Sequence, residues 1–349
     1  MLDAATPTCR LSSPLRRSTV GMVPRPETLA GVAVSCIVPG LNEHDNLAQL
    51  LPQLSALLEQ LGTRWEIIMV DDGSTDATPQ LMAQWTQRPG FGYVQLSRNF
   101  GKEAALSAGL EAAQGEVVIL LDSDMQHPIS LIPVLLSRWL EGYDNVYAVR
   151  ENRDDEGPVK RMGSSLFYGL LSSTRGVRVP PHAGDFRLLD RTVVDALLRL
   201  PERTRFMKGL YAWVGFASIA VDYTPDERLH GSSHYSMLRL LRLAFDGLTA
   251  FTTWPLRMVS LLGFLLAMLS VAYGLYLVVN YFMHEHPLSG WTTIVTLQLF
   301  SAGIILISIG IVGEYLARVF DEVKGRPLYL VRQHLPSRLS APAHDKENE

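Results

Sequence analysis

Acidic and amide side chains gather at points where short apolar runs of the sequence end. Each of the runs 34–38, 66–70 and 117–121 is followed by such a pair, namely Asn42 with Glu43, Asp71 with Asp72, and Asp122 with Asp124. A single Asp after a strand is usually only the cap of the next helix. Three pairs can share one cleft if the runs are parallel strands that end at the same edge of a sheet.

The spacing of Asp122 and Asp124 lets two carboxylates from one turn reach a single hard cation. Mg²⁺ typically takes one or two carboxylates and completes its shell with water and substrate phosphate oxygens. Such an ion would neutralise a departing diphosphate. Gln126 and Pro128 follow closely and strengthen the pattern. The chain has no Gly-x-Gly-x-x-Gly after its first apolar run and no Gly-Lys-Ser/Thr loop, which argues against a dinucleotide site and a P-loop.

The elements that must position these side chains alternate along the sequence. Strands are predicted at 34–38, 66–70, 93–96, 117–121 and 146–149, and helices at 46–61, from about 79, at 102–113 and at 131–140. Alternation at these lengths predicts a mostly parallel α/β sheet that is covered on both faces. We therefore expect a catalytic domain over residues 32–235.

Composition limits the function classes. Of 349 residues, 47% are hydrophobic, and the formal net charge is −4, so there is no basic field of the kind that attracts nucleic acid. The two cysteines, Cys9 and Cys36, form neither a disulfide framework nor a metal cluster. Residues 1–31 mix arginines with Ser, Thr and Pro and lack a continuous apolar stretch, so we predict a disordered leader and no secretory signal.

Two uncharged stretches near the C-terminus, 258–282 and 291–313, are each long enough to cross a bilayer. We place a transmembrane hairpin at 256–317, an amphipathic interfacial helix at 236–255 and a tail at 318–349. The connector 284–290 has no Lys or Arg, whereas basic residues flank both outer ends: Arg239, Arg242 and Arg257 before, and Arg318, Lys324, Arg326 and Arg332 after. The positive-inside rule predicts that both termini and the large domain are cytoplasmic.

Four motifs together resemble the family 2 glycosyltransferases with the GT-A fold: VPGLNE at 38–43, DDGSTD at 71–76, RNFGK at 98–102 and DSDMQHP at 122–128. The chain is most similar to bacterial polyprenyl-phosphate glycosyltransferases of the undecaprenyl-phosphate glucosyl and aminoarabinose type, which are related to dolichol-phosphate mannose synthases. The resemblance extends from about residue 34 to 330 and includes the hairpin. One departure is Leu41, where many relatives have an aromatic residue, so an aromatic contact with the base is in doubt.

The resemblance implies a role for each matching position. The nucleotide sugar would contact Pro39, Asn42, Glu43, Asp71, Asp72, Asp122 and Arg228, and the acceptor phosphate would contact Arg150, Arg161 and Ser165. Asp122, Asp124 and Gln126 would hold Mg²⁺ or Mn²⁺. Asp124 and Asp185 would be catalytic, with Asp185 acting as a base or by positioning substrate. Arg150 and Arg161 also flank a polar stretch and could be ordinary solvated charges, and Asp185 could be structural.

By resemblance, we expect inverting transfer from a nucleotide sugar, UDP- rather than GDP-linked, to undecaprenyl phosphate, for cell-envelope glycan or lipopolysaccharide modification. The expected location is the bacterial inner membrane, and the expected assembly is a homo-oligomer such as a tetramer. One alternative is a processive polysaccharide synthase, but its Gln-x-x-Arg-Trp motif is absent, since Leu135 precedes Arg138 and Trp139. The other is a non-catalytic lipid-binding or flippase-like membrane protein, in which the acidic set would have no purpose.

Overall fold

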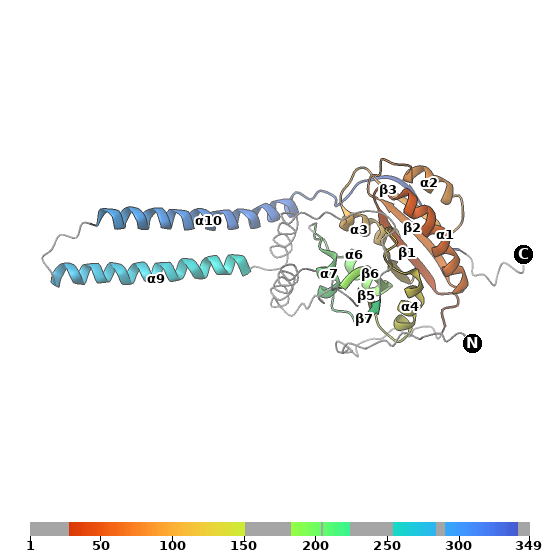
Figure 1. Ribbon diagram of the computed structural model, residues 1–349, viewed down its shortest axis with the longest axis horizontal. Helices are drawn as coiled ribbons and strands as arrows, with labels where there is room; N and C mark the ends of the chain where they lie inside the picture. Colours follow the sequence, from red (N-terminus) through yellow and green to blue (C-terminus); the bar gives the residue numbers. More distant parts are fainter. Residues whose placement is uncertain (1–27, 151–182, 204, 224–253, 284–289, 341–349) are drawn as a thin grey trace, which may run out of the picture. The chain divides into compact units, whose positions relative to one another are not determined.

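The computed structural model describes residues 28–150, 183–203, 205–223, 254–283 and 290–340. They belong to two compact units (Figure 1). One unit is built around a twisted sheet, and the other, within residues 236–326, contains two long helices. The first unit also includes the described residues 327–340, which follow the second unit in the sequence.

The described residues form an eight-stranded sheet in the order β7-β5-β6-β4-β1-β2-β3-β8. The strands are β1 (Ala33–Gly40), β2 (Arg64–Asp71), β3 (Phe91–Leu96), β4 (Val117–Leu120), β5 (Asn145–Arg150), β6 (Ala183–Asp190), β7 (Ser218–Tyr223) and β8 (Val331–Leu335). The four central strands β4, β1, β2 and β3 are parallel. Strand β6 runs antiparallel to both β4 and β5, and β8 runs antiparallel to β3. The predicted mostly parallel sheet is confirmed.

The central strands have little contact with solvent on either face. In β1 every residue from Ala33 to Pro39 is buried, and in β2 only Arg64 is exposed. Continuous apolar strands of this kind are typical of parallel sheets that are covered on both sides. Their register aligns Gly40 with Asp71, so β1 and β2 end level with each other.

Helices cover both faces of the sheet (Figure 1). They are α1 (His44–Gln60), α2 (Thr78–Trp85), α3 (Lys102–Ala112), α4 (Ile132–Leu140), α6 (Arg191–Leu198) and α7 (Met207–Trp213). The buried leucines of α1, together with Met82 of α2 and the apolar face of α4, pack on the same sheet face as Val34, Cys36 and Val38. Helix α3 lies on the opposite face against β1 and β2. A Cβ on Gly109 would come within 2.3 Å of Ile37, so this close helix–sheet contact requires glycine.

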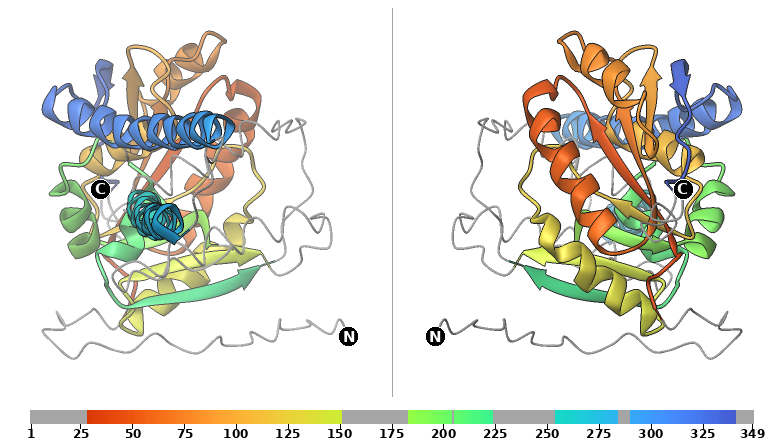
Figure 2. Two further views of the ribbon diagram at one scale, coloured as in Figure 1. Left: turned by 90° about the vertical axis from the view of Figure 1, so that its left-hand side faces the viewer. Right: turned by 90° about the vertical axis from the view of Figure 1, so that its right-hand side faces the viewer.

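The segment that follows the hairpin returns to the catalytic domain. Strand β8 pairs with β3 at the edge of the sheet, and Figure 2 shows this blue strand alongside the orange β3. Beyond β8, the Ser340 backbone N–H donates to the Trp65 carbonyl at 2.9 Å, and Ser337 is buried. The buried Glu66 carboxylate accepts hydrogen bonds from Ser35, from Ser337 and, at 2.6 Å, from the Gln114 backbone N–H. A buried carboxylate with several donors is stable, and this one holds the C-terminal segment against the sheet.

The second unit contains α9 (Trp254–Met283) and α10 (Trp291–Val323). At 1.5 Å per residue, helices of 30 and 33 residues are about 45 and 50 Å long. The most apolar windows are Met258–Tyr276, with a mean hydropathy of 2.1, and Phe300–Val323, with a mean hydropathy of 1.8. Their large apolar side chains are exposed, with Leu269 66% and Leu306 69% accessible. Helices of this length with such surfaces fit a membrane hairpin.

Helix α10 differs from the prediction at its end. The second membrane span was predicted to end at about residue 313, where the uncharged stretch ends, but the helix continues to Val323. An ion pair between Glu314 and Arg318, at 3.4 Å and with i,i+4 spacing, supports the added turns. Charged residues close a membrane span without ending the helix. The predicted interfacial helix at 236–255, the leader and the connector lie almost entirely outside the described residues.

Candidate active site at the carboxyl edge of the sheet

The loops after β1 and β2 are joined through Asn42. This residue has a φ of 58°, a left-handed conformation that Asn adopts more readily than most residues. Its side-chain Oδ1 accepts the Thr75 backbone N–H at 2.8 Å, and its own backbone N–H donates to Ser74 Oγ at 2.8 Å. Asn42 thereby fixes the separation of the two loops that were predicted to hold the nucleoside.

Asp71 and Asp72 are adjacent in sequence but serve different parts of the protein. Asp71 is fully buried, and its carboxylate accepts hydrogen bonds from the Tyr93 hydroxyl at 2.6 Å and the Ser74 backbone N–H at 2.7 Å. Asp72 accepts the backbone N–H groups of Phe100 at 2.7 Å and Gly101 at 2.9 Å. Burial raises the pKa of Asp72, and these two hydrogen bonds oppose the rise. Both carboxylates therefore shape the loops around the site.

A glycine between these loops permits close backbone packing. Gly73 has a φ of 84°, and a Cβ there would lie 2.7 Å from the Arg98 carbonyl carbon. The DDG turn and the Arg98–Lys102 loop are consequently in direct contact. The start of helix α3 is thus positioned by the end of β2.

The first residue of α3, Lys102, joins two carboxylates from different strands. Its Nζ lies 2.6 Å from Asp122 Oδ1, just after β4, and 2.7 Å from Asp185 Oδ2, in β6. Lys208 Nζ, from α7, lies 3.7 Å from the other oxygen of Asp185. The Lys102 side chain is 42% exposed, so water screens these pairs and they contribute little to stability. These ion pairs matter because they bring the carboxylates of Asp122 and Asp185 to the same ammonium group.

The antiparallel pairing of β4 and β6 explains why these carboxylates meet. The register pairs Leu120 with Arg187, and continuing it by two residues brings Asp122 opposite Asp185. Because β6 runs against β4, its beginning lies at the edge where β4 ends. Asp185 therefore joins the acidic residues that follow the parallel strands, although it lies far from them in the sequence.

Charge pairing keeps the two carboxylates ionised. Burial by itself raises the pKa of Asp185, but Lys102 and Lys208 outweigh burial and hold this pKa well below its usual range. Burial also raises the pKa of Asp122, and the His127 hydrogen bond and Lys102 bring it below its ordinary value. Burial lowers the pKa of Lys102, yet Asp122 and Asp185 raise it overall. The arrangement is a stable group of alternating charges at neutral pH.

His127 is oriented by its surroundings. Its Nδ1 lies 2.9 Å from the Tyr223 hydroxyl, and its Nε2 lies 3.5 Å from Asp122 Oδ2. The ring also packs against Phe186 with a centroid separation of 5.1 Å. A histidine held in this way can orient a carboxylate that binds a metal.

The predicted metal-binding residues are hard oxygen donors on one turn. Asp124 Oδ1 accepts the Gln126 backbone N–H at 3.2 Å, and Met125 between them has a φ of 56°. Asp122 and Asp124 both raise the pKa of Glu43, although burial is the largest cause, so the acidic side chains share one region. Among the described residues no three His, Cys, Asp or Glu side chains form a complete metal cluster. The set suits a cation that takes its remaining ligands from water and phosphate.

A second group of polar side chains lies buried behind Asp185. The Arg187 guanidinium lies 3.7 Å above the Tyr211 ring and donates to the Gly184 carbonyl at 2.6 Å. Glu103 is next to Lys102 in the chain, and burial followed by the charge of Asp185 raises its pKa to about 7. Glu103 Oε2, Arg187 Nε and the Tyr211 hydroxyl are buried without a hydrogen-bond partner in the part of the chain that the structure describes. Buried groups of this kind are expensive and set the electrostatic field around Asp185.

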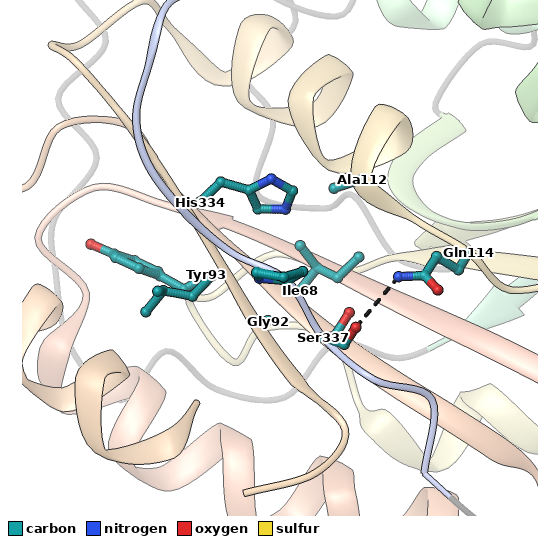
Figure 3. Close-up of a pocket in the computed structure, with 9 residues that line it drawn as sticks. Ile68, Gly92, Tyr93, Ala112, Gln114, His334 and Ser337 are labelled. Atoms are coloured by element: carbon teal, nitrogen blue, oxygen red, sulfur yellow. Dashed lines mark hydrogen bonds between the residues drawn. The ribbon is translucent and has the colours of Figure 1, made fainter. Parts of the chain in front are cut away.

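A small pocket forms away from these carboxylates (Figure 3), between β3, helix α3 and the returning C-terminal segment. Gly92, Tyr93 and Gln114 line it together with His334 and Ser337 of the C-terminal segment. Its volume of about 30 Å³ is enough for a single water molecule but far too small for a nucleotide sugar. The pocket belongs to the packing of the C-terminal segment.

The structure brings most of the predicted site residues together. Asn42, Glu43, Asp71, Asp72, Asp122, Asp124, Gln126 and Asp185 surround the carboxyl ends of β1, β2 and β4, and Pro39 lies near the end of β1. Arg150 ends β5. The predicted Arg161, Ser165 and Arg228 lie outside the described residues.

Sequence reasoning assigned no role to Lys102 and His127, although both stand inside quoted motifs. Their motif positions were a signal that could have identified them. What the sequence did not supply was the partner of each side chain. The Asp185 partner of Lys102 lies in β6 and the Tyr223 partner of His127 lies in β7, and neither strand was predicted.

The chain matches two family descriptions. "Glycosyl transferase family 2" matches residues 35–198, and "GtrB C-terminal hairpin" matches residues 254–319. The first match contains every carboxylate of the site, and the second contains α9 and most of α10.

Relatives align along nearly their full length. An uncharacterized glycosyltransferase of Synechocystis sp. is 43% identical over 86% of this chain and 95% of its own length. The prophage-derived bactoprenol glucosyl transferase of Shigella flexneri is 37% identical over 86% and 97%. Among solved structures, mannosyl-3-phosphoglycerate synthase from Rubrobacter xylanophilus covers 62% of this chain and 71% of its own, with 21% identity and a TM-score of 0.43. The full-length relatives establish that the chain belongs to glycosyl transferase family 2.

Proposed function

We propose that this protein is an inverting glycosyltransferase that moves a sugar from a nucleotide sugar to a polyprenyl phosphate. The observation that carries the proposal is the ion-paired group at the carboxyl edge of the sheet, in which Lys102 contacts both Asp122 and Asp185. A chain that also has two long, exposed apolar helices can present this edge to a lipid substrate. The relatives named as bactoprenol glucosyl transferases, which align over 86% of this chain, and the hairpin match at residues 254–319 support the same acceptor class.

The donor would bind over the loops after β1, β2 and β4. Asn42, Glu43 and the DDG turn offer the nucleoside-facing surface, and Asp122 offers a ligand near the diphosphate. Asp124 and Gln126 would hold Mg²⁺ or Mn²⁺, which supplies neutralisation of the departing diphosphate when it is bound. The donor is proposed to be UDP-linked, and this choice rests on the resemblance to bacterial relatives.

The acceptor needs little activation. A phosphate monoester has a second pKa near 6, so it is largely a dianion at neutral pH and is already a nucleophile. Asp185 is held ionised by two lysines, which makes it a weak proton acceptor. We therefore assign it the task of orienting the acceptor or the sugar for in-line displacement. Arg150, Arg161 and Ser165 are the proposed phosphate ligands, since the guanidinium fork matches phosphate oxygens.

The proposed location is the bacterial inner membrane, with both termini cytoplasmic. Nucleotide sugars are made in the cytoplasm, and the basic residues flank the outer ends of the hairpin. Cysteines at Ser289 and Lys324, in a background without Cys9 and Cys36, would be exposed to an impermeant thiol reagent on intact cells. Ser289→Cys should react, and Lys324→Cys should react only after the membrane is opened. The reverse labelling would place the site outside and refute the proposal.

A processive polymerase is a weaker candidate. Arg138 and Trp139 lie on α4, where Arg138 pairs with Glu141 at 2.8 Å and the Trp139 indole N–H donates to Asp190 at 2.8 Å. Both side chains thus serve the packing of α4. A panel of labelled nucleotide sugars, given to membranes with undecaprenyl phosphate, would separate the two functions. We expect one sugar per lipid, whereas a polymeric product would favour the synthase.

An assembled homo-oligomer, such as a tetramer, is part of the proposal and can be measured by native mass spectrometry.

A further inference from the structure

Lys102 is the only described residue with ion pairs to both Asp122 and Asp185. Asp122 belongs to the proposed donor and metal side, and Asp185 to the proposed acceptor side. The two distances, 2.6 and 2.7 Å, place one ammonium directly between the two carboxylates. Lys102 has no substrate or metal contact in the proposed function.

The backbone that leads into Lys102 is fixed by Asp72, which follows β2. Lys102 is the first residue of α3, and Gly101 before it has a φ of 100°, a conformation that favours glycine. The Asp72 carboxylate accepts the N–H groups of Phe100 and Gly101. The start of the lysine side chain is therefore held in place, while its long stem leaves the ammonium free to shift.

Each carboxylate also has a second cationic or hydrogen-bonding neighbour. Asp122 Oδ2 faces His127 Nε2 at 3.5 Å, and Asp185 Oδ1 faces Lys208 Nζ at 3.7 Å. Asp185 therefore keeps a cationic neighbour in Lys208 if Lys102 moves away, and Asp122 keeps a polar neighbour in His127. The ammonium can consequently leave one carboxylate without stranding a buried charge.

We propose that Lys102 is a positioning residue whose ammonium neutralises Asp122 until a divalent cation binds, and afterwards holds Asp185 for the reaction. This inference rests on the proposed function and names a coupling within its site. A divalent cation and an ammonium cannot both approach the same carboxylate oxygen without strong repulsion. Cation binding at Asp122 would therefore transfer the Lys102 pairing fully to Asp185, linking donor arrival to the acceptor side.

Competition for Asp122 gives a test that does not rely on activity. Mn²⁺ binding to the full-length protein in detergent would be measured by electron paramagnetic resonance, without nucleotide. Lys102→Met removes the competing charge, so its Kd for Mn²⁺ should fall by about fivefold or more. Its turnover number for transfer should nevertheless fall by about tenfold or more, because Asp185 loses its positioning partner. A purely structural role would weaken both properties.

Two variants serve as controls. Lys208→Met removes a positive charge that touches Asp185 but not Asp122, so Mn²⁺ affinity should change far less than in Lys102→Met. Lys102→Arg keeps the charge and should leave Mn²⁺ affinity near that of the wild type. Unchanged or weaker Mn²⁺ binding by a folded Lys102→Met protein would overturn the inference, even if the wild type transfers sugar to lipid. Failure of the wild type to transfer sugar to any polyprenyl phosphate would instead refute the proposed function.

Discussion

Two pairs of carboxylates at the same sheet edge have different environments. Asp71 and Asp72, after β2, accept hydrogen bonds from neutral groups of the protein, namely a tyrosine hydroxyl and backbone N–H groups. Asp122 and Asp185 instead face the charged side chains Lys102 and Lys208. Hydrogen bonds from neutral groups of the protein hold the Asp71 and Asp72 loops in one structure. A lysine beside a carboxylate can instead be displaced by a cation that arrives with a ligand. The first pair builds the loops, and we propose that the second pair is the reactive part of the site.

The largest effect should come from the second pair. Asp122→Asn or Asp124→Ala should lower transfer by about a hundredfold or more, since the proposed cation loses a ligand and the leaving diphosphate its neutralisation. Thermal unfolding should be nearly unchanged, because neither carboxylate supports a buried loop. Excess chelator should have the same effect on the wild-type protein, with recovery on adding Mg²⁺ or Mn²⁺. Full activity in chelator would refute the metal requirement.

Asp185→Asn should reduce the turnover number by about a hundredfold while the KM for the nucleotide sugar changes little. The amide keeps the size of the side chain but loses the charge that Lys102 and Lys208 face. Steady-state kinetics with each substrate varied in turn would measure this. A variant that loses donor affinity alone would move Asp185 to the nucleotide side of the site.

Arg161→Ala tests the acceptor side at a residue that lies outside the described part of the chain. Loss of a charged hydrogen bond, worth about 1.5–3 kcal/mol, should raise the KM for lipid phosphate by about tenfold or more. The KM for nucleotide sugar should stay within about twofold of the wild-type value. A change in the donor KM alone would contradict the acceptor assignment.

For the first pair, Asp72→Asn should affect stability more than chemistry. The side-chain amide offers one oxygen where two backbone N–H groups now bind two carboxylate oxygens. One buried donor is left unsatisfied, which costs about 1–3 kcal/mol of unfolding free energy. Chemical denaturation of the variant would measure the loss. Equal stability of Asp72→Asn and Asp122→Asn would remove the distinction between the two pairs.

The smallest effect on transfer is expected at Glu103, next to Lys102, where the change is one of pH-dependent stability. Its pKa is raised to about 7 in the folded protein from an ordinary value near 4.5, so the folded state binds the proton more tightly. Stability should therefore fall as pH rises from about 4.5 to 7, and it should level off above that range. Glu103→Gln should abolish this fall, which the shift of the Glu103 pKa limits to about 3 kcal/mol of unfolding free energy. Thermal unfolding at pH 5 and pH 8 would show whether the pH dependence is lost.

Much of this site could be predicted from the sequence because its parts are local. The runs before Asn42, Asp71 and Asp122 are apolar and bounded by turns, so their strand ends were evident. Asp185 was identified only by resemblance, since its place opposite Asp122 depends on an antiparallel strand inserted between β4 and β5. The sequence pattern around β6 contains Gly184, Asp185 and Arg187 and does not alternate clearly, so the strand gave little signal.

The return of the C-terminal segment was missed for a related reason. Residues 331–340 are polar and largely exposed, which is typical of a tail. Their structure depends on partners far away in sequence, in particular Glu66 and the edge of β3. Pairing across a separation of more than two hundred residues has no local signature. The sequence could therefore define the strands that carry the donor loops but not the strand that closes the sheet.

The central claim is tested most directly by the stoichiometry of a single reaction. Purified full-length protein would be given labelled nucleotide sugar and undecaprenyl phosphate, with released nucleoside diphosphate and lipid-linked sugar measured in the same sample. We predict equal amounts of the two products, dependence on the lipid phosphate, and a loss of both products by about a hundredfold or more with Asp122→Asn. Release of nucleoside diphosphate without lipid-linked sugar, or the same products from the variant, would contradict the account.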